Sequence, residues 1–532
     1  MPSLAKVPPE ILEHIAFFAA TDPLLGPPAG IIPLLATNRR IHSVLAFDSN
    51  PHLWACIFSH KFDVSAAVRR LGRERTSPVA MAEELKERCL LMRRIRERKD
   101  TLVSSINVNA EHMHVLSSIL WMAYLMMLEN DGRNERQLRE YARIDEWLKE
   151  FLFHQSGASL IQLSVTLDAW PSGDDERTSL AMWLFWMLLR PDDYMTDEST
   201  FYHTTSVLKL VALGAHQYSL CTPSWRDFIP PHHLKDVSQT TRYAASLSLV
   251  PPAPAAPAIL SYLTLINKLP VSWDTISYMK PPEPSVPSVG GTSGSREWEA
   301  EWERSVGLAI SATPLGPDLS GAFVPGSLEG YWEGLFTYTE FTAYAALLSG
   351  ASPSVLERSL VAQHPQLWKL REHHLYAEED DDDLAGPNPR LSEPLTAGSP
   401  LRAYIPTGTE VHEVPDGLEV KEPERPLVVY ESWAAVRANP EKARKRRRVR
   451  DVIITGEGHS AWGQFNLVGR IRPCDGFISL SKDYMNDDRG RWLYRGYIIG
   501  NAHGNLSGRW RDTLSPSDVQ GYEGCFMMSR RK

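Results

Sequence analysis

The hydrophobic residues of this chain recur with two different periods, and this change of period limits the fold more than any other feature of the sequence. Between about residues 63 and 270 they repeat at helical spacing, and one helix face carries Leu138, Tyr141, Ile144, Trp147, Leu148 and Phe151. In 463–471 they alternate instead, so that Phe465, Leu467 and Ile471 point one way and the polar residues point the other. The chain is therefore predicted to be an α+β protein whose helices precede its antiparallel strands.

Changes in composition divide the 532 residues into several predicted domains. A chain of this length exceeds what one hydrophobic core usually covers. The fold class that we predict is multidomain α+β. It comprises a small helical motif at 1–62, an all-α domain at 63–270, a Pro/Gly/Ser-rich linker or loop at 271–318, and an antiparallel β-barrel-like domain at 319–532.

The C-terminal segments are short, alternating and closely connected, which is the pattern of an antiparallel meander. Closing the meander into a barrel would remove its exposed edge strands. Similar pieces, GYWEG at 330–334 and GRW at 508–510, indicate that the first and last strands meet. Apparent helices at 343–372 predict a helical insertion, and two charged stretches predict an acidic loop at 377–400 and a basic loop at 436–450.

The bulk composition excludes several classes of protein. With 56 Lys and Arg against 65 Asp and Glu, the net charge is −9, which argues against nucleic-acid binding because phosphate binding needs a positive field. The 5 cysteines include no C-x-x-C pair, so neither a zinc cluster nor a disulfide framework is predicted. The apolar runs at 119–128 and 180–189 are shorter than a membrane span and are predicted to be buried core helices. Because the N-terminus also lacks a signal-peptide layout, we expect no membrane partner and a location in the cytoplasm and/or nucleus.

The stretch VPPEILEHI at 7–15 predicts a helix with more apolar surface than it can cover by itself. Pro8 or Pro9 suits the first helical turn, and Glu10 is favoured near the positive helix end. A broad apolar stripe follows, made of Ile11, Leu12, Ile15 and Phe18. Further short helices complete a unit of roughly fifty residues, and so small a unit commonly needs a partner. It either docks on another protein or packs on the helical domain of the same chain.

These N-terminal helices resemble the F-box motif. The matching residues are Pro8, Glu10, Ile11, Leu12, Ile15, Asp22, Leu35, Asn38, Arg39, Ile41, Leu53 and Trp54. The sequence departs from the motif at Val7, where the motif has leucine, and in a long proline-rich joint at 23–30. The resemblance implies a helical trio that binds the Skp-type adaptor of a cullin ubiquitin ligase. The implied adaptor-binding residues are Pro8, Pro9, Glu10, Ile11, Leu12, Ile15, Leu35, Leu53 and Trp54.

The C-terminal segments carry a second resemblance. The patterns G-x-G-H-x-x-W-G-x-F, D-G-x-I-x-L-x-K-x-Y, W-x-Y-x-G-Y and G-x-W are similar to a β-barrel module of fungal F-box proteins. More distantly, the architecture resembles the substrate-binding barrel of the cyclin-degrading F-box class. Together the resemblances imply a non-catalytic substrate receptor, which recruits an unidentified protein to ubiquitination through its C-terminal domain.

An alternative from another class is a barrel that binds a small apolar ligand, with N-terminal helices that serve only architecture. The aromatic side chains expected to line such a barrel are Phe336, Phe465, Phe477, Trp492 and Trp510. In small barrels such side chains more commonly fill the interior.

Two charged runs lie among these segments. The acidic run Glu378 to Asp383 is expected to be solvated. The basic run at 442–450 predicts either a nuclear import signal or an exposed loop before a strand at 451–455. The residues of the import signal would be Lys442, Arg444, Lys445, Arg446, Arg447 and Arg448.

No motif predicts catalysis, a cofactor or a metal site. The stretch GEGHSAWG at 456–463 lacks the Lys-Ser/Thr pair and the following helix of a P-loop, and it is typical of a β-turn with an exposed His459. Neighbouring histidines such as His373 and His374 would point in different directions on a helix. We therefore expect no enzymatic activity, no cofactor and no metal.

Overall fold

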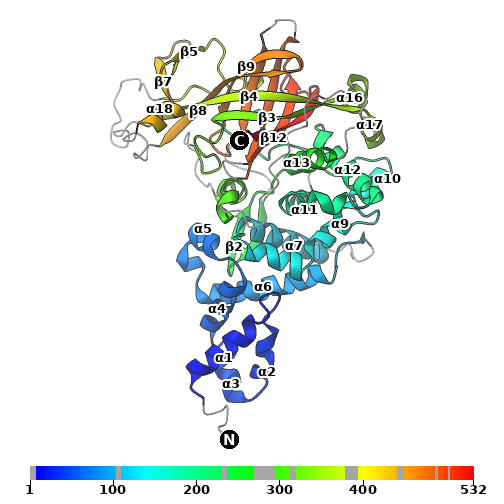
Figure 1. Cartoon of the computed structure of the whole chain (residues 1–532), viewed down its shortest axis with the longest axis vertical. Helices are drawn as coiled ribbons and strands as arrows, with labels where there is room; N and C mark the ends of the chain where they lie inside the picture. Colours follow the sequence, from blue (N-terminus) through cyan, green and yellow to red (C-terminus); the bar gives the residue numbers. More distant parts are fainter. Residues whose placement is uncertain are drawn as a thin grey trace.

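The computed structural model describes residues 7–103, 110–173, 175–230, 237–268, 294–310, 319–377, 393–439, 448–485, 489–500 and 504–531. It is an α+β protein in which helices dominate the N-terminal part and an antiparallel barrel occupies the C-terminal part. The N-terminal helices lie at one end of the molecule and the barrel lies at the other, with the remaining helices between them (Figure 1).

Eight antiparallel strands close into the barrel, in the order β3, β13, β12, β11, β10, β9, β8 and β4. β3 pairs with both β13 and β4, which confirms that the first and last strands of the predicted meander meet. Closure gives every one of these strands a neighbour on both sides, so the barrel has no free edge. The strands are β3 Gly330–Thr339, β4 Val361–Tyr376, β8 Val449–Ser460, β9 Gly463–Ile471, β10 Ile478–Tyr484, β11 Arg491–Ile499, β12 Asn505–Asp512 and β13 Glu523–Arg530.

The barrel interior is filled by one set of the alternating side chains. The largest of them are Trp332, Phe336, Trp368, Phe465, Tyr494, Trp510 and Phe526. One of the aromatic residues expected to line the barrel, Phe477, lies elsewhere, whereas Trp492 packs against the edge of the interior cluster. Phe477 precedes β10 and packs against Tyr497 in the core shared with the helices, with ring centroids 5.2 Å apart. Trp492 is half-buried near the start of β11, where its ring lies 5.2 Å from that of Trp510.

The segment 343–372, which the sequence predicts to be helical, is divided between helix and strand. The helices α16 Phe341–Leu348 and α17 Pro353–Arg358 form an insertion between β3 and β4. The strand β4 then runs for 16 residues from Val361. Its buried residues, among them Trp368 and Leu370, alternate with partly exposed ones. This is the period of a strand, and the preceding helices obscured it.

A three-stranded extension continues the sheet beyond β4, through β7 Leu427–Ser432, β6 Gly417–Lys421 and β5 Glu410–Val414. The charged runs 378–392 and 440–447 lie outside the described residues. The described ends of the predicted basic loop are regular structure, because α18 Trp433–Ala438 precedes it and β8 begins at Val449.

The central body is built from helices around a large hydrophobic core. Its two most apolar sequence runs fall in α7 Ala110–Leu128 and α11 Glu176–Met187, and both are buried as predicted. None of the helices in the described part of the chain is both long enough and apolar enough to cross a membrane. The other helices of the body are α5 Ser65–Arg75, α6 Pro78–Arg96, α8 Arg133–Arg136, α9 Ile144–Phe153, α10 Ile161–Thr166, α12 Glu198–Leu213 and α13 Ala255–Ile266.

The body is not all-α, because a β-hairpin interrupts the region 63–270. The strands β1 Ser238–Arg242 and β2 Ala245–Leu249 are joined by Tyr243 and Ala244, and both of these residues have positive φ. A two-residue turn of this kind matches the twist of the strands. Its usual glycine or asparagine is missing here, so the sequence shows no hairpin signal. The hairpin was therefore not predicted.

Part of the predicted linker at 271–318 is also folded. Gly294–Trp298, Glu299–Trp302, Glu303–Gly307 and Leu308–Ile310 form consecutive helical turns. Trp298 and Trp302 are buried in the central core, and the Arg70 guanidinium donates a 3.0 Å hydrogen bond to the Ser295 carbonyl. Glycine and serine in this stretch suggest a linker, but the two tryptophans anchor it to the body. Residues 269–293 and 311–318 lie outside the described residues.

Candidate functional site

The N-terminal helices form a small module at the end of the molecule farthest from the barrel (Figure 1). The helix α1 Pro9–Thr21 follows Pro8 and carries Pro9 at its first position. The next helices begin where asparagine oxygens accept backbone N–H groups, from Ile41 at 2.9 Å and from Leu53 at 3.0 Å. These elements are η2 Ala29–Ile31, α2 Ile32–Leu35, α3 Arg39–Leu45 and α4 Pro51–Lys61.

One face of α1 is buried and the other is exposed. Leu12, Ala16 and Ala20 are almost fully buried and belong to the main hydrophobic core. On the opposite face Ile11, Ile15 and Phe18 are exposed by 50%, 41% and 67%. Their spacing of four and three residues places them on one stripe of the helix. The helix α1 therefore buries one face in the hydrophobic core and still presents apolar side chains to solvent.

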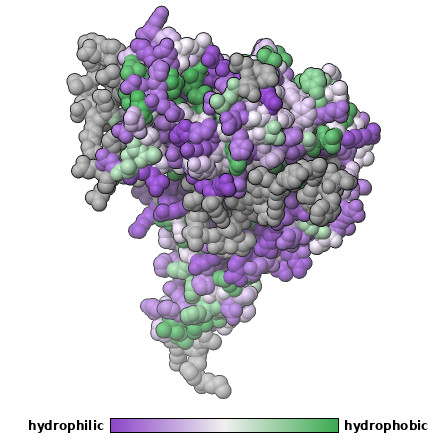
Figure 2. All heavy atoms as spheres, turned by 45° about the horizontal axis from the view of Figure 1, so that its top comes forward, coloured by the Kyte–Doolittle hydropathy of each residue, from purple (hydrophilic) through white to green (hydrophobic). Residues whose placement is uncertain are grey.

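A fourth exposed apolar residue, Ile32, lies on the segment that flanks α1, and 62% of it is accessible. A Cβ atom at Gly30 would lie 2.1 Å from the Ala19 carbonyl oxygen, so this segment packs directly on α1. We refer to Ile11, Ile15, Phe18 and Ile32 as the tip surface. Figure 2 shows hydrophobic residues gathered at this narrow end of the molecule. The sequence placed Phe18 on the apolar stripe but not among the predicted adaptor-binding residues, and Ile32 was not predicted at all.

The predicted adaptor-binding residues divide between surface and core. Pro8, Pro9, Glu10, Ile11 and Ile15 are exposed, and Leu35 is half-buried. The remaining three are core residues, so their prediction as contact residues needs correction. Leu12 and Leu53 are buried, and Trp54 is buried with its indole N–H donating to the Leu45 carbonyl at 3.0 Å. Leu12, Leu53 and Trp54 therefore contribute to the hydrophobic core and not to the surface of the module.

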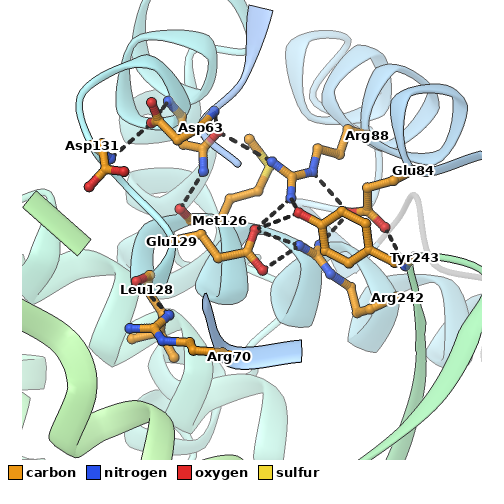
Figure 3. Close-up of polar contacts among 11 residues, drawn as sticks. Asp63, Arg70, Glu84, Arg88, Met126, Leu128, Glu129, Asp131, Arg242 and Tyr243 are labelled. Atoms are coloured by element: carbon orange, nitrogen blue, oxygen red, sulfur yellow. Dashed lines mark hydrogen bonds and ion pairs between the residues drawn. The ribbon is translucent and has the colours of Figure 1, made fainter. Parts of the chain in front are cut away.

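A buried ion network lies in the central body (Figure 3). The Arg88 guanidinium on α6 contacts Glu84 at 2.9 Å and Glu129 at 2.6 Å. Arg242 in the hairpin contacts the same two carboxylates at 2.9 and 3.1 Å. Burial alone would raise the pKa of Glu84, but the adjacent Arg242 and Arg88 guanidinium groups hold it below its ordinary value. The network thus joins α6, the end of α7 and the hairpin.

A separate polar contact joins the module to the body. The Asp63 carboxylate, just after α4, accepts backbone N–H groups from Asp131, Arg133 and Asn134 at 2.8–2.9 Å. These amides lie at the start of α8, so Asp63 caps that helix from another part of the chain. The module is therefore held in a defined position on the body.

The barrel interior contains an unusual lysine. The Lys482 side chain is 1% exposed and lies 3.9 Å from the centre of the Phe465 ring, with further aromatic rings around it. Its ammonium group donates to the Gln366 side-chain oxygen at 3.2 Å, and no carboxylate of the described residues pairs with it. Burial lowers the pKa of Lys482 to about 7. The sequence pattern D-G-x-I-x-L-x-K-x-Y includes Lys482, but the pattern did not predict that this side chain is buried.

The histidines considered in the sequence analysis either make contacts within the barrel or lie at its surface. His373 and His374 lie on β4 and not on a helix, so their side chains point to opposite faces. His374 contacts the Glu372 carboxylate at 2.8 Å, and His373 contacts the Thr455 hydroxyl at 3.0 Å. His459 is exposed beside the turn between β8 and β9, as predicted. No group of three or more potential metal-ligating side chains occurs within the described residues.

The basic run cannot be placed beside these sites. Lys442, Arg444, Lys445, Arg446 and Arg447 lie outside the described residues, and Arg448 is described directly before β8. Its carbonyl accepts the backbone N–H of Ala377 at 2.9 Å. Nuclear import through this run stays a prediction.

Comparison with known proteins adds no assignment to these sites, because no protein-family model, curated protein or solved structure matches the chain.

Proposed function

We propose that the chain is an F-box-type substrate receptor. In this proposal the tip surface binds a Skp-type adaptor and, through it, a cullin ubiquitin ligase. The opposite end, which includes the C-terminal barrel, would hold an unidentified protein substrate. The observation that carries the proposal is the stripe of Ile11, Ile15 and Phe18, which stays exposed although the opposite face of α1 is buried in the hydrophobic core. Exposed apolar residues in a contiguous patch are typical of protein interaction sites.

The proposed mechanism is proximity and requires no chemistry by this chain. A receptor that holds a substrate near a ubiquitin-loaded enzyme raises the effective concentration of the reacting groups. A connected hydrophobic core includes Leu12 in the module and Met527 on the barrel strand β13. Such a body would hold the two proposed binding sites at a fixed distance from each other. The protein would act in the cytoplasm and/or nucleus, where such ligases would meet it.

The alternative, a barrel that binds a small apolar ligand, has less support from the geometry. Phe336, Phe465 and Trp510 lie in the interior as that alternative requires, but they pack against one another and against neighbouring side chains. This is the usual way in which small barrels fill their interior. The alternative also gives no role to the exposed tip surface.

The proposal predicts that two substitutions on the tip surface abolish adaptor binding. We would measure binding of a purified Skp-type adaptor to the full chain and to the Ile11→Asp/Ile15→Asp variant. Placing carboxylates in an apolar interface should weaken binding about 100-fold or more. Leu12 is left unchanged because its substitution would disrupt the core.

The matched control is Leu167→Asp/Leu360→Asp, which alters two apolar residues outside the module that are 70% and 76% exposed. It should bind the adaptor as the wild-type chain does. Circular dichroism would establish that both variants are folded. Absence of binding by the folded wild-type chain, or equal loss in both variants, would contradict the proposal.

A further inference from the structure

An open pocket of about 490 Å³ lies where the helix α4 of the module meets α1 and the start of α6. Phe17 of α1 lines one side, Pro78 and Met81 of α6 line another, and Arg133 at the start of α8 completes the wall. Among the residues that the structure describes, none of the tip surface and none of the barrel lines this pocket. It is therefore separate from both sites described above.

The wall that α4 contributes carries a histidine, a cysteine and a second histidine at intervals of one helical turn. His52, Cys56 and His60 occupy positions i, i+4 and i+8, which lie on one face of a helix. All three side chains are exposed, whereas the apolar residues between them are buried. Cys56 is also the exposed one of the five cysteines, because the others are half-buried or buried. The hydrophobic core therefore does not account for this polar face.

The first two of these side chains already lie in contact. The His52 Nε2 atom is 3.9 Å from the Cys56 Sγ atom, and neither side chain has another polar partner among the described residues. Zinc binds sulfur at about 2.3 Å and imidazole nitrogen at about 2.0–2.1 Å, so two such ligands of a tetrahedral ion lie about 3.6 Å apart. A small rotation of the side chains therefore brings both atoms onto one ion. Histidine pairs at the same i, i+4 spacing bind zinc on helices.

The third side chain does not belong to the same site. His60 begins about 12 Å from His52 along the helix axis. Its ring packs edge-on against the Phe17 ring, with centroids 5.5 Å apart. His52 and Cys56 are thus the two side chains that one ion can reach.

The donor atoms of this pair favour soft metal ions. A thiolate and an imidazole are ligands that Zn²⁺ prefers, whereas Mg²⁺ and Ca²⁺ need oxygen ligands, and no carboxylate of the described residues lines the pocket. Arg133 is the one permanently charged side chain among the described lining residues. Its guanidinium is directed away from the pair, because it donates to the Ser59 carbonyl at 2.7 Å. The negative charge of the thiolate would offset part of the charge of the metal ion.

We propose that His52 and Cys56 bind a soft divalent metal ion of the zinc class in this pocket. Binding forms one bond from His52 Nε2 to the ion and one from Cys56 Sγ, and the thiol proton is released to solvent. Water fills the remaining positions of the tetrahedron. The ion joins two successive turns of α4 and so stabilises this helix. The sequence predicts no metal site because the pair lacks the C-x-x-C spacing of zinc clusters.

The first test uses the full chain under reducing conditions, with Co²⁺ as a spectroscopic substitute for Zn²⁺. Cobalt bound by Cys56 should show thiolate-to-metal charge-transfer absorption in the near ultraviolet, which binding by exposed histidines alone does not give. Zn²⁺ should displace the cobalt with a Kd on the order of 10 μM, as expected for a site with two protein ligands. Mg²⁺ should not displace it.

Three variants assign the ligands. Cys56→Ser should abolish the charge-transfer band, and His52→Gln should weaken cobalt binding more than about tenfold, because loss of even an outer-shell partner costs that much. Both positions are exposed, so both variants should fold, which circular dichroism checks. The control is His42→Gln, which replaces an exposed histidine of the same module outside the pocket and should leave binding unchanged.

Thermal unfolding gives a second readout, because an ion that binds only the native state raises the melting temperature. Zn²⁺ should raise it for the wild-type chain and not for Cys56→Ser. Absence of the band in the wild-type chain would overturn the proposal, and so would a band that persists in Cys56→Ser or equal binding by His52→Gln and His42→Gln. The metal is measured without any adaptor, so this result is independent of the proposed receptor function.

Discussion

At the scale of single residues, the structure contains an amino group that is buried without a counter-ion among the described residues. Lys482 lies inside the barrel among aromatic rings, and burial lowers its pKa to about 7 from an ordinary value of 10.5. Below about pH 7 the native and unfolded states both hold the proton, so the full cost of burying the charge is present. Between about pH 7 and 10.5 only the unfolded state holds it. The free energy of unfolding contributed by this residue therefore rises with pH across that window.

Replacing this lysine should remove that pH dependence. For Lys482→Met we expect the wild-type free energy of unfolding, relative to the variant, to rise by about 1–3 kcal/mol between pH 7 and 9.5. Denaturant unfolding at several pH values measures the difference. Lys369→Met, at a lysine whose side chain is 44% exposed, should follow the wild-type profile. Parallel profiles for wild type and Lys482→Met would show that the lysine keeps its ordinary pKa.

At the scale of elements, the two faces of α1 lie in different environments. Leu12 on the inner face belongs to the core, whereas Ile11 and Ile15 on the outer face contact solvent. Stability should therefore depend on the inner face, and partner binding on the outer one. A helix that served only the internal architecture would have no need for the outer apolar stripe.

The faces can be separated by alanine substitutions in α1. Leu12→Ala should lower local stability by about 2–5 kcal/mol because it leaves a cavity in the core. Ile11→Ala and Ile15→Ala should change stability by less than about 0.5 kcal/mol. Hydrogen exchange of the α1 amides, followed by mass spectrometry, reports the local stability. Similar losses of protection in all three variants would show that the outer face is also packed.

At the scale of the whole molecule, buried polar contacts hold distant parts of the central body together. The network of Arg88, Arg242, Glu84 and Glu129 joins helices to a hairpin that lies more than a hundred residues later in the chain. With two positive and two negative groups, the network is balanced. Removal of one member leaves an uncompensated buried charge, which makes the body sensitive at this point.

We expect Arg88→Met to lower the free energy of unfolding by about 3–5 kcal/mol, because Glu84 and Glu129 then share only Arg242. Arg93→Met on the same helix removes an exposed ion pair with Glu97 and should cost no more than about 0.5 kcal/mol. Urea unfolding of the full chain compares the two. A loss in Arg88→Met no larger than in Arg93→Met would mean that the network contributes little to holding the body together.

The sequence by itself determined the local structure of this protein. Hydrophobic periods specify where helices and strands occur, as in the helix α9 and the strand β9. Proline and asparagine mark the helix starts in the module, and the apolar excess of α1 is visible directly. The β1–β2 hairpin and the helical turns at 294–310 escaped prediction, because their turn residues and composition are atypical for the structure that they adopt.

Only the tertiary structure decided which residues meet. The inward face of α1 and the burial of Lys482 depend on contacts between distant parts of the chain. Strand pairing brings Arg495 opposite Arg509, and no local pattern encodes that register. The physical reason is that burial and charge compensation are properties of the assembled core, whereas periodicity and capping act within a few residues.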